Sequence, residues 1–232
     1  MITVCMATYN GEPFIRRQLE SILKQLGSED EVIISDDGST DQTLAIVENI
    51  DDPRTRIIHN EGESGPVANF ENALRHARGE YIFLSDQDDV WFPNKVSRML
   101  PLLERYDLIL TDCVVVNKHE QTLMPSFFNH RGSKPGLMHN LYKNSYVGCC
   151  MAFRRSLLDR ALPFPPRIHM HDWWLGLIAE TYFNVYFLPE PTIYYVRHGN
   201  NASPTGEGSL PWRQKIKNRL VLSFSLINRV LR

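Results

Sequence analysis

Short apolar runs alternate with amphipathic helical segments through the first half of the chain, and this alternation restricts the fold more than any other feature. The predicted strands lie at 2–7, 32–34, 56–59 and 81–84. The predicted helices lie between them, at 15–26, 44–47 and 66–77. Strands that are separated by helices pair in parallel, with helices on both faces of the sheet. The sequence therefore predicts an α/β fold with a mostly parallel central sheet.

Three carboxylates stand within four positions directly after the fourth predicted strand, at Asp86, Asp88 and Asp89. Open α/β sheets bind their ligands at the carboxyl ends of the strands. Like charges packed this closely are unfavourable unless a cation lies among them, and clustered carboxylate oxygens suit Mg²⁺. The sequence thus indicates a metal site, with a solvated acidic turn before the next helix as the alternative.

Two further polar loops follow predicted strands and should face these acids across one cleft. They carry Thr8, Tyr9, Asn10 and Glu12 in the first loop, and Asp36 and Asp37 in the second. Neither a G-x-G-x-x-G pattern nor a P-loop occurs, so a bound nucleotide diphosphate would need a metal to neutralise it. Asp36 or Asp37 could accept hydrogen bonds from a base or ribose. A tight turn that caps the next helix is the alternative for this second loop.

Composition excludes several classes of protein. The chain has 232 residues, 43% of them hydrophobic, and a net charge of −2, which argues against disorder and against a general nucleic-acid binder. The four cysteines lack metal-ligand spacing and lie in apolar stretches, so reduced core thiols are expected. We expect no signal peptide, because no basic region followed by a long apolar block opens the sequence, and no spanning helix, because no run of 18 apolar residues occurs. A cytoplasmic protein, soluble or attached to a surface, is predicted.

Three blocks of this sequence, at 7–12, 35–41 and 85–91, together resemble the signature motifs of family 2 glycosyltransferases. The Ser-Asp-Gln-Asp-Asp-Val-Trp form of the third block resembles the bacterial rhamnosyltransferase-like branch, which builds surface polysaccharides of the O-antigen or capsule type. The resemblance covers roughly the first two hundred residues. It implies the GT-A fold, a dTDP- or UDP-linked sugar donor, a divalent metal, and inversion at the anomeric carbon.

Carried over residue by residue, the resemblance implies that Asp86 and Asp88 form the DxD element that holds Mg²⁺ or Mn²⁺, with Asp88 as the direct ligand. Asp36 would hold the base. The other implied donor-binding residues are Thr8, Tyr9, Asn10, Glu12, Asp37, Asp86 and Gln87.

A second polar cluster, at 169–174, precedes the apolar helix predicted at 175–182. An inverting transfer is a single in-line displacement and needs one general base. Asp172 matches the catalytic acidic residue of the family by position, and Trp173 or Trp174 would stack on an acceptor sugar. The alternatives are a helix cap at Asp172 and a core position for Trp174.

The segment 194–201 resembles the family's C-terminal His-Gly-x-Asn block. It implies that His198 reaches the metal or the diphosphate, with Arg197 as a candidate contact to the pyrophosphate. A structural histidine is the alternative. No Gln-x-x-Arg-Trp motif, which marks processive members, follows Asp172, so addition of a single sugar is favoured.

The last residues of the chain differ from the rest in charge. From Ser209 to Arg232 there is no acidic residue, while six are basic: Arg213, Lys215, Lys217, Arg219, Arg229 and Arg232. An i, i+4 stripe of apolar residues runs beside them, at Trp212, Ile216, Leu220 and Phe224. This pattern predicts a surface helix attracted to anionic lipid, with a helix docked on the body as the alternative. Members of the family are often longer, which would make this end a truncation.

We therefore expect a donor-binding half at 1–112, an acceptor-binding and catalytic half of the same GT-A domain at 113–205, and a basic amphipathic helix at 206–232. The predicted activity is metal-dependent transfer of one sugar to a glycan or lipid-linked acceptor in bacterial surface polysaccharide synthesis, at the inner face of the cell membrane. A sugar nucleotidyltransferase would need a glycine-rich basic loop after the first strand, which 8–12 lacks. A non-catalytic sugar-binding or membrane-scaffold module would have no use for both the acid cluster and Asp172.

Overall fold

The computed structural model describes residues 1–199, 201 and 211–231. Asn200 of the C-terminal block, the boundary expected at 206, the predicted start of the basic tail at Ser209, and Arg232 lie outside these residues.

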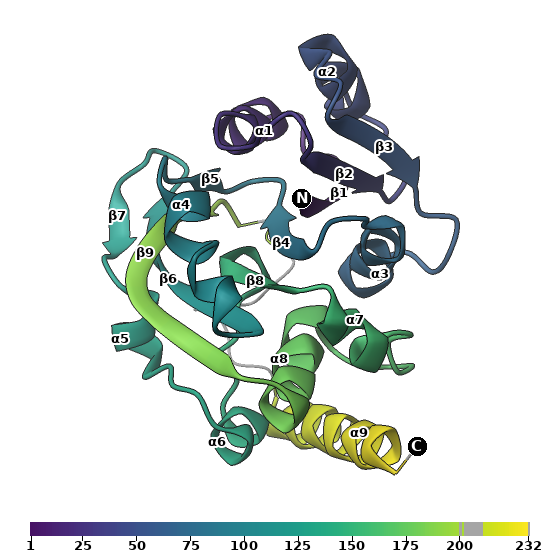
Figure 1. Cartoon of the computed structure of the whole chain (residues 1–232), viewed down its shortest axis with the longest axis vertical. Coiled ribbons are helices and arrows are strands. Elements are labelled where there is room, and N and C mark those ends of the chain that lie inside the picture. The colour runs from purple at the N-terminus through teal and green to yellow at the C-terminus, as the bar shows by residue number, and fades with distance from the viewer. Residues whose placement is uncertain (200, 202–210, 232) are drawn as a thin grey trace.

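The described residues form a nine-stranded mixed sheet (Figure 1). Its strands are β1 (Ile2–Thr8), β2 (Glu31–Asp36), β3 (Thr55–His59), β4 (Tyr81–Asp86), β5 (Val90–Trp91), β6 (Leu108–Asn117), β7 (Thr122–Met124), β8 (Met151–Arg154) and β9 (Val185–Arg197). The order across the sheet is β3-β2-β1-β4-β8-β6-β9-β5, with β7 paired to β6. The first four strands are parallel, as the alternating pattern predicts, and β8 is antiparallel to both of its neighbours.

Helices cover both faces of the sheet. They are α1 (Ile15–Leu23), α2 (Thr43–Ile50), α3 (Pro66–His76), α4 (Lys95–Met99), α5 (Phe127–Arg131), α6 (Leu137–Tyr142), α7 (Ser156–Ala161), α8 (His171–Tyr182) and α9 (Trp212–Val230). In Figure 1, α1 and α2 lie on one side of β1–β3 and α3 lies on the other. The core strands are apolar on both faces because both faces are covered, and Val4, Ile33 and Phe83 are fully buried.

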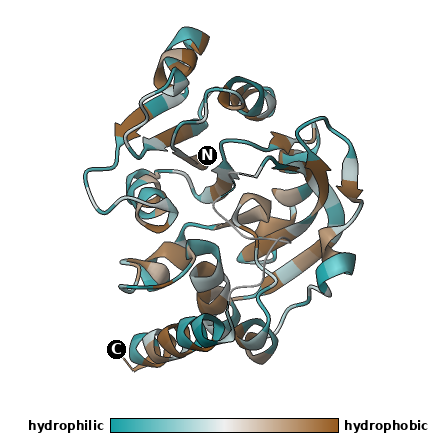
Figure 2. Ribbon diagram, turned by 180° about the vertical axis from the view of Figure 1, so that it is seen from behind, coloured by the Kyte–Doolittle hydropathy of each residue, from teal (hydrophilic) through white to brown (hydrophobic). Residues whose placement is uncertain are grey.

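The C-terminal helices form a separate layer. Helix α8 packs on α3, α6, α7 and α9, and α9 lies at the outer edge beside α6 (Figure 1). Figure 2 shows hydrophobic residues along the strands and α8, whereas α9 carries both hydrophobic and hydrophilic residues along its length. Among residues 1–199, 201 and 211–231, no helix is both long and apolar enough to span a bilayer. The predicted α/β architecture, with a mostly parallel first half of the sheet and a C-terminal helix, is confirmed.

Candidate active site

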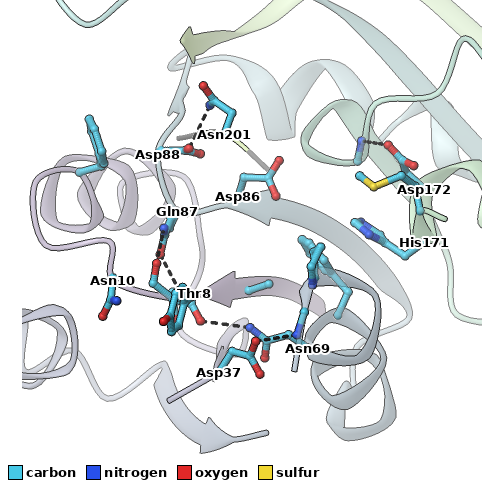
Figure 3. A pocket seen from close by; sticks show the side chains of 18 of the residues that line it. Thr8, Asn10, Asp37, Asn69, Asp86, Gln87, Asp88, His171, Asp172 and Asn201 are labelled. Carbon is cyan, nitrogen blue, oxygen red and sulfur yellow. Dashed lines mark hydrogen bonds between the residues drawn. The ribbon is translucent and has the colours of Figure 1, made fainter. Parts of the chain in front are cut away.

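The carboxyl ends of β1, β2 and β4 meet at one cavity of about 1230 Å³. The loop at 144–148, the start of α8 and the residues after β9 line its other side (Figure 3). Residues from the two halves of the chain therefore face each other across a space large enough for a nucleotide-sized ligand.

Two glutamine side chains fix the acid-bearing loop after β4. The Gln87 amide pairs with the backbone of Tyr9, donating to the Tyr9 carbonyl and accepting its N–H, both at 2.9 Å. Buried Gln18 of α1 donates to Ser85 Oγ at 2.7 Å and to the Asp86 carbonyl at 3.1 Å. These bonds hold the loop against β1 and α1, so the positions of its carboxylates are set by the fold.

The predicted metal ligands lie close together. Asp88 Oδ2 is 2.6 Å from His198 Nε2, although the two residues are 110 positions apart in the chain. Asn201 donates to the same Asp88 oxygen at 3.2 Å. The His198 ring stacks on Phe14, with 4.5 Å between ring centroids. The end of β9 and the end of β4 thus supply one oxygen and nitrogen cluster at the cavity.

A third carboxylate, Asp89, belongs to the acidic cluster that predicted the metal site but was not among the implied metal ligands. Its Oδ1 accepts the Val196 N–H at 3.0 Å, while its Oδ2 is buried with no hydrogen-bond partner among the described residues. Ligand atoms of Asp86, Asp89 and Cys149 lie within 4.8 Å of one another. Burial, then the charge of Asp88, raises the pKa of Asp86 to about 8 and that of Asp89 well above its ordinary range.

These groups fit a hard divalent cation. Asp86 and Asp89 are buried close together, and their raised pKa values show that burial and mutual repulsion disfavour their charged forms. Burial also raises the pKa of the Cys149 thiol, so it stays protonated and the oxygens remain as the ligands on offer. Oxygen ligands with one imidazole suit Mg²⁺ or Mn²⁺.

Asp172 occupies the opposite side of the cavity, in the first turn of α8 (Figure 3). Its Oδ2 accepts the Gly148 N–H at 3.1 Å, and its Oδ1 accepts the Trp173 N–H at 2.6 Å. The N-cap of α8 is Met170, so Asp172 lies within the first turn and does not cap it. Burial raises the pKa of the Asp172 carboxyl to about 7, which suits a group that takes up a proton near neutral pH.

The predicted donor-binding residues divide into two groups. Those that line the cavity are Thr8, Tyr9, Asn10, Asp37, Asp86 and Gln87. Asp36 and Glu12 do not line it. Asp36 is buried and accepts hydrogen bonds from neighbouring loop groups through both oxygens, so the turn uses its carboxylate. Glu12 accepts the Gln42 N–H at the start of α2. Of the two acids of the second loop, Asp37 is the one that lines the cavity. Its Oδ1 accepts the Asn60 amide at 2.8 Å and its Oδ2 accepts the Gly65 N–H at 2.7 Å, and each oxygen keeps a lone pair for a base or ribose.

Three other predicted contacts do not fit the structure. Arg197, the last residue of β9, is absent from the cavity lining in the described part of the chain. Trp173 donates its indole N–H to the Asn140 carbonyl at 2.8 Å, and Trp174 donates to the Ala161 carbonyl at 2.9 Å. Both indoles are buried because α8 packs against α6 and α7, so neither offers a face to an acceptor sugar.

His171 lines the cavity beside Asp172, and no role was predicted for it. Its ring stacks on Phe70 with 3.9 Å between centroids. Both ring nitrogens are buried and find no hydrogen-bond partner within the described residues. Burial lowers the pKa of His171 to about 3, so the ring is neutral. Its place in the polar cluster at 169–174 was the one sign of this position in the sequence.

Residues 3–162, more than half of the chain, match the sequence profile of Glycosyl transferase family 2. The chain belongs to this family: it is a glycosyltransferase, and it has the GT-A fold. It is 40% identical over 211 residues to the putative colanic acid biosynthesis glycosyl transferase WcaA of Escherichia coli K12, covering 86% of this chain and 74% of that protein.

Two other relatives have names that state a donor. The dTDP-rhamnosyl transferase RfbG of Shigella flexneri is 29% identical, with 84% of this chain and 72% of that protein covered. The UDP-Glc:alpha-D-GlcNAc-diphosphoundecaprenol beta-1,3-glucosyltransferase WfgD of Escherichia coli is 28% identical, with 78% and 70% covered.

Solved structures share the fold. S. aureus TarS 1–349 in complex with UDP-GlcNAc superposes with a TM-score of 0.76 at 23% identity, over 98% of this chain and 66% of that one. The mannosyltransferase PcManGT of Pyrobaculum calidifontis, in complex with GDP-Man and Mn²⁺, superposes with a TM-score of 0.64 at 25% identity, over 98% and 64%. The chain thus spans slightly less than two thirds of these two structures.

Proposed function

We propose that this enzyme transfers a single sugar with inversion at the anomeric carbon, in a reaction that requires Mg²⁺ or Mn²⁺. One observation carries the proposal: Asp86 and the Asp88–His198 pair lie on one side of a cavity, and Asp172 lies on the other (Figure 3). An inverting displacement needs its leaving group and its general base on opposite faces of the sugar. This arrangement supplies both.

The charge of the cavity supports a metal requirement. Its described lining residues include four aspartates, one lysine (Lys118) and no arginine. A donor diphosphate would be repelled by such a lining unless a cation accompanied it. When bound at Asp86, Asp88 and His198, Mg²⁺ or Mn²⁺ would neutralise the diphosphate and stabilise it as a leaving group.

Asp172 would act as the general base. The N–H groups of Gly148 and Trp173 hold its carboxylate in place at the cavity. As the acceptor oxygen attacks the anomeric carbon, its proton passes to Asp172, and the bond from that carbon to the diphosphate oxygen breaks. The new glycosidic bond forms on the face opposite the departing diphosphate, which inverts the configuration.

The two halves of the chain would divide the substrates between them. Tyr9, Asn10 and Asp37 in the half at 1–112 would hold the base and ribose of a dTDP- or UDP-linked sugar. The half at 113–205 would hold the acceptor. The names of WfgD, which acts on a diphosphoundecaprenol-linked sugar, and of WcaA, a putative colanic acid glycosyl transferase, support a lipid-linked glycan acceptor in surface polysaccharide synthesis. Such an acceptor would bring the enzyme to the inner face of the cell membrane.

The test is a panel of UDP- and dTDP-sugars scored by nucleotide release, with Mn²⁺ and with EDTA. We expect one donor to dominate, and EDTA to abolish release. Asp88→Ala should abolish turnover and weaken binding of the nucleoside diphosphate in the presence of Mn²⁺, because the donor charge loses its counterion. Glu61→Ala, an exposed carboxylate outside the cavity, is the matched control.

Transfer by Asp88→Ala at the wild-type rate would contradict the metal assignment. Release of pyrophosphate from a nucleoside triphosphate and a sugar phosphate would indicate a nucleotidyltransferase instead. Binding of sugars without nucleotide release under any of these conditions would indicate a non-catalytic module.

A further inference from the structure

The outer face of α9 is apolar along its whole length. Its exposed apolar residues are Trp212, Ile216, Leu220, Phe224, Ile227, Val230 and, at the helix end, Leu231. They recur at intervals of three or four residues, so they share one side of the helix. The side that packs on the protein instead carries Asn218, Leu222 and Leu226, which are buried. A helix of this length presents an apolar stripe about 28 Å long.

Helix α6 extends this surface. Met138 and Tyr142 are 77% and 74% exposed, and α6 packs beside α9. Arg219 joins the two helices, since its guanidinium donates to the Tyr142 carbonyl at 2.9 and 2.5 Å and lies 5.5 Å from the centre of the Tyr142 ring. We call the exposed residues of both helices the α9–α6 face. A monomeric soluble protein seldom exposes so large a continuous apolar patch without using it.

The basic residues of α9 do not all have the same role. Arg229 donates to the carbonyls of Arg160, Leu162 and Pro163, so both it and Arg219 hold the helix to the body. The side chains of three others, Arg213, Lys215 and Lys217, make no hydrogen bond or ion pair with the described residues. By helical spacing, Arg213 and Lys217 lie along one edge of the stripe and are exposed, whereas Lys215 lies on the packed side of the helix and is half-buried.

Apolar residues flanked by cations, with no acidic residue from 211 to 231, complement an anionic lipid surface. The apolar stripe would enter the acyl boundary while the long basic side chains reach the headgroups. An apolar protein partner would gain nothing from the flanking charges. The charge pattern therefore favours lipid as the occupant.

We propose that the α9–α6 face docks on an anionic lipid bilayer, with α9 lying in the plane of the headgroups. This proposal rests on the proposed lipid-linked acceptor for its purpose. Tyr142 lies two residues before Asn144, which lines the cavity, so a docked α6 would bring the 144–148 side of the cavity to the membrane. The glycan of an acceptor could then enter the cavity while its lipid stays in the bilayer.

The full chain should be tested by sedimentation with vesicles of phosphatidylglycerol and phosphatidylcholine, and with vesicles of phosphatidylcholine alone. We expect binding to the anionic vesicles. Replacing Arg213 and Lys217 by Gln should weaken this binding about 30-fold at low salt, since each basic residue near the surface contributes about fivefold. The difference should shrink at high salt, because screening already suppresses that attraction.

Leu220→Glu with Phe224→Glu should abolish binding at any salt concentration, because it removes insertion. A matched control replaces two exposed cations on and beside α1, Arg16 and Lys24, by Gln and should bind as the wild type does. Thermal unfolding of each variant establishes that it is folded.

Failure of the wild type to bind, or equal losses in the control, would overturn the proposal. The proposal would also be overturned if the wild type were a dimer that does not bind vesicles and that dissociates in the Leu220→Glu, Phe224→Glu variant. Binding of nucleotide sugar with Mn²⁺ is measured without vesicles in the same variants. Loss of vesicle binding with retained donor binding separates this surface from the active site, and the absence of donor binding in the wild type would count against the proposed function alone.

Discussion

At the scale of single residues, Asp172 combines a fixed position with a raised affinity for protons. Because burial raises its pKa to about 7, the ionised form that can act as a base is lost as the pH falls below neutrality. We expect kcat/KM to fall about tenfold per pH unit below that value. Asp172→Asn should lower kcat by about 10²- to 10⁴-fold with little change in donor affinity, and should remove this acidic limb.

The measurement is the pH–rate profile of nucleotide release for both proteins. Asn has nearly the same shape and keeps one oxygen that can accept the Gly148 N–H, so it separates chemistry from folding. A loss confined to KM or to stability would show that Asp172 only supports the start of α8.

For His171, we expect a substitution that stabilises the protein. A buried polar group without a partner costs about 1–3 kcal/mol, and both ring nitrogens of His171 are in that position. His171→Phe keeps a ring against Phe70, so we expect the free energy of unfolding to rise. The gain should grow below about pH 6.5, because the unfolded histidine binds a proton that the folded one, with a pKa of about 3, refuses.

Urea unfolding at two pH values tests this, with His59→Phe, at an exposed position, as the control. A loss of stability in His171→Phe would mean that water or another group satisfies the ring nitrogens in solution.

At the scale of elements, the close approach of α8 to the cavity wall depends on Gly176. A Cβ atom at this position would lie 2.2 to 2.4 Å from three ring carbons of Tyr146, whose side chain is buried. Glycine inside a helix is normally less stable than alanine by roughly 0.5–1 kcal/mol. Here we expect the reverse: Gly176→Ala should destabilise the protein by about 1–3 kcal/mol through overpacking.

Chemical denaturation of Gly176→Ala, Tyr146→Ala and the double variant measures this contact. If the clash is the cause, Gly176→Ala should be neutral or stabilising in the Tyr146→Ala background. Equal losses in both backgrounds would point to another cause. Tyr146 also lines the cavity, so Gly176→Ala, which displaces its ring, should lose activity as well.

The elements also show what the sequence could predict. The first four strands were recognisable because parallel strands buried on both faces are continuous apolar runs. The acids after β4 and Asp172 before an apolar helix were found because strand ends and helix starts are visible in the pattern. The acceptor role expected for Trp173 and Trp174 finds no support in their buried indoles, and the core alternative given for Trp174 agrees with its burial. The same residue types serve a core and a sugar site, and only the packing of α6 and α7 on α8 decides between them.

The roles of the other carboxylates depend on tertiary structure. Asp89 follows Asp88 directly, and only the pairing of β5 with β9 brings it under Val196. Asp36 and Asp37 are adjacent and chemically equal, and the turn at Gly38 and Ser39 decides that Asp36 is bound within the turn while Asp37 lines the cavity. Such choices follow from which way a side chain points, which neighbouring letters in a sequence do not specify.

At the scale of the whole molecule, the cavity gathers carboxyl groups that resist ionisation. Burial raises the pKa of Asp172 to about 7, and burial with the charge of Asp88 raises that of Asp86 to about 8. In the unfolded chain the same groups lose their protons near pH 4. Between these limits the two carboxyls bind more protons in the folded state than in the unfolded state, so their contribution to the free energy of unfolding falls as the pH rises.

We therefore expect the cation-free protein to lose stability from about pH 7 to about pH 8. Most unfolded histidines are already neutral in this window, so they contribute little to the change. Mn²⁺ should oppose this loss, because a cation favours the ionised carboxylates and binds the folded state. Asp172→Asn removes one of the titrating groups, so its stability should fall less steeply with pH. Urea unfolding with EDTA and with Mn²⁺, for both proteins, measures these slopes. A stability that is flat or rises over this window in EDTA would show that the carboxylates are already ionised and have another counterion.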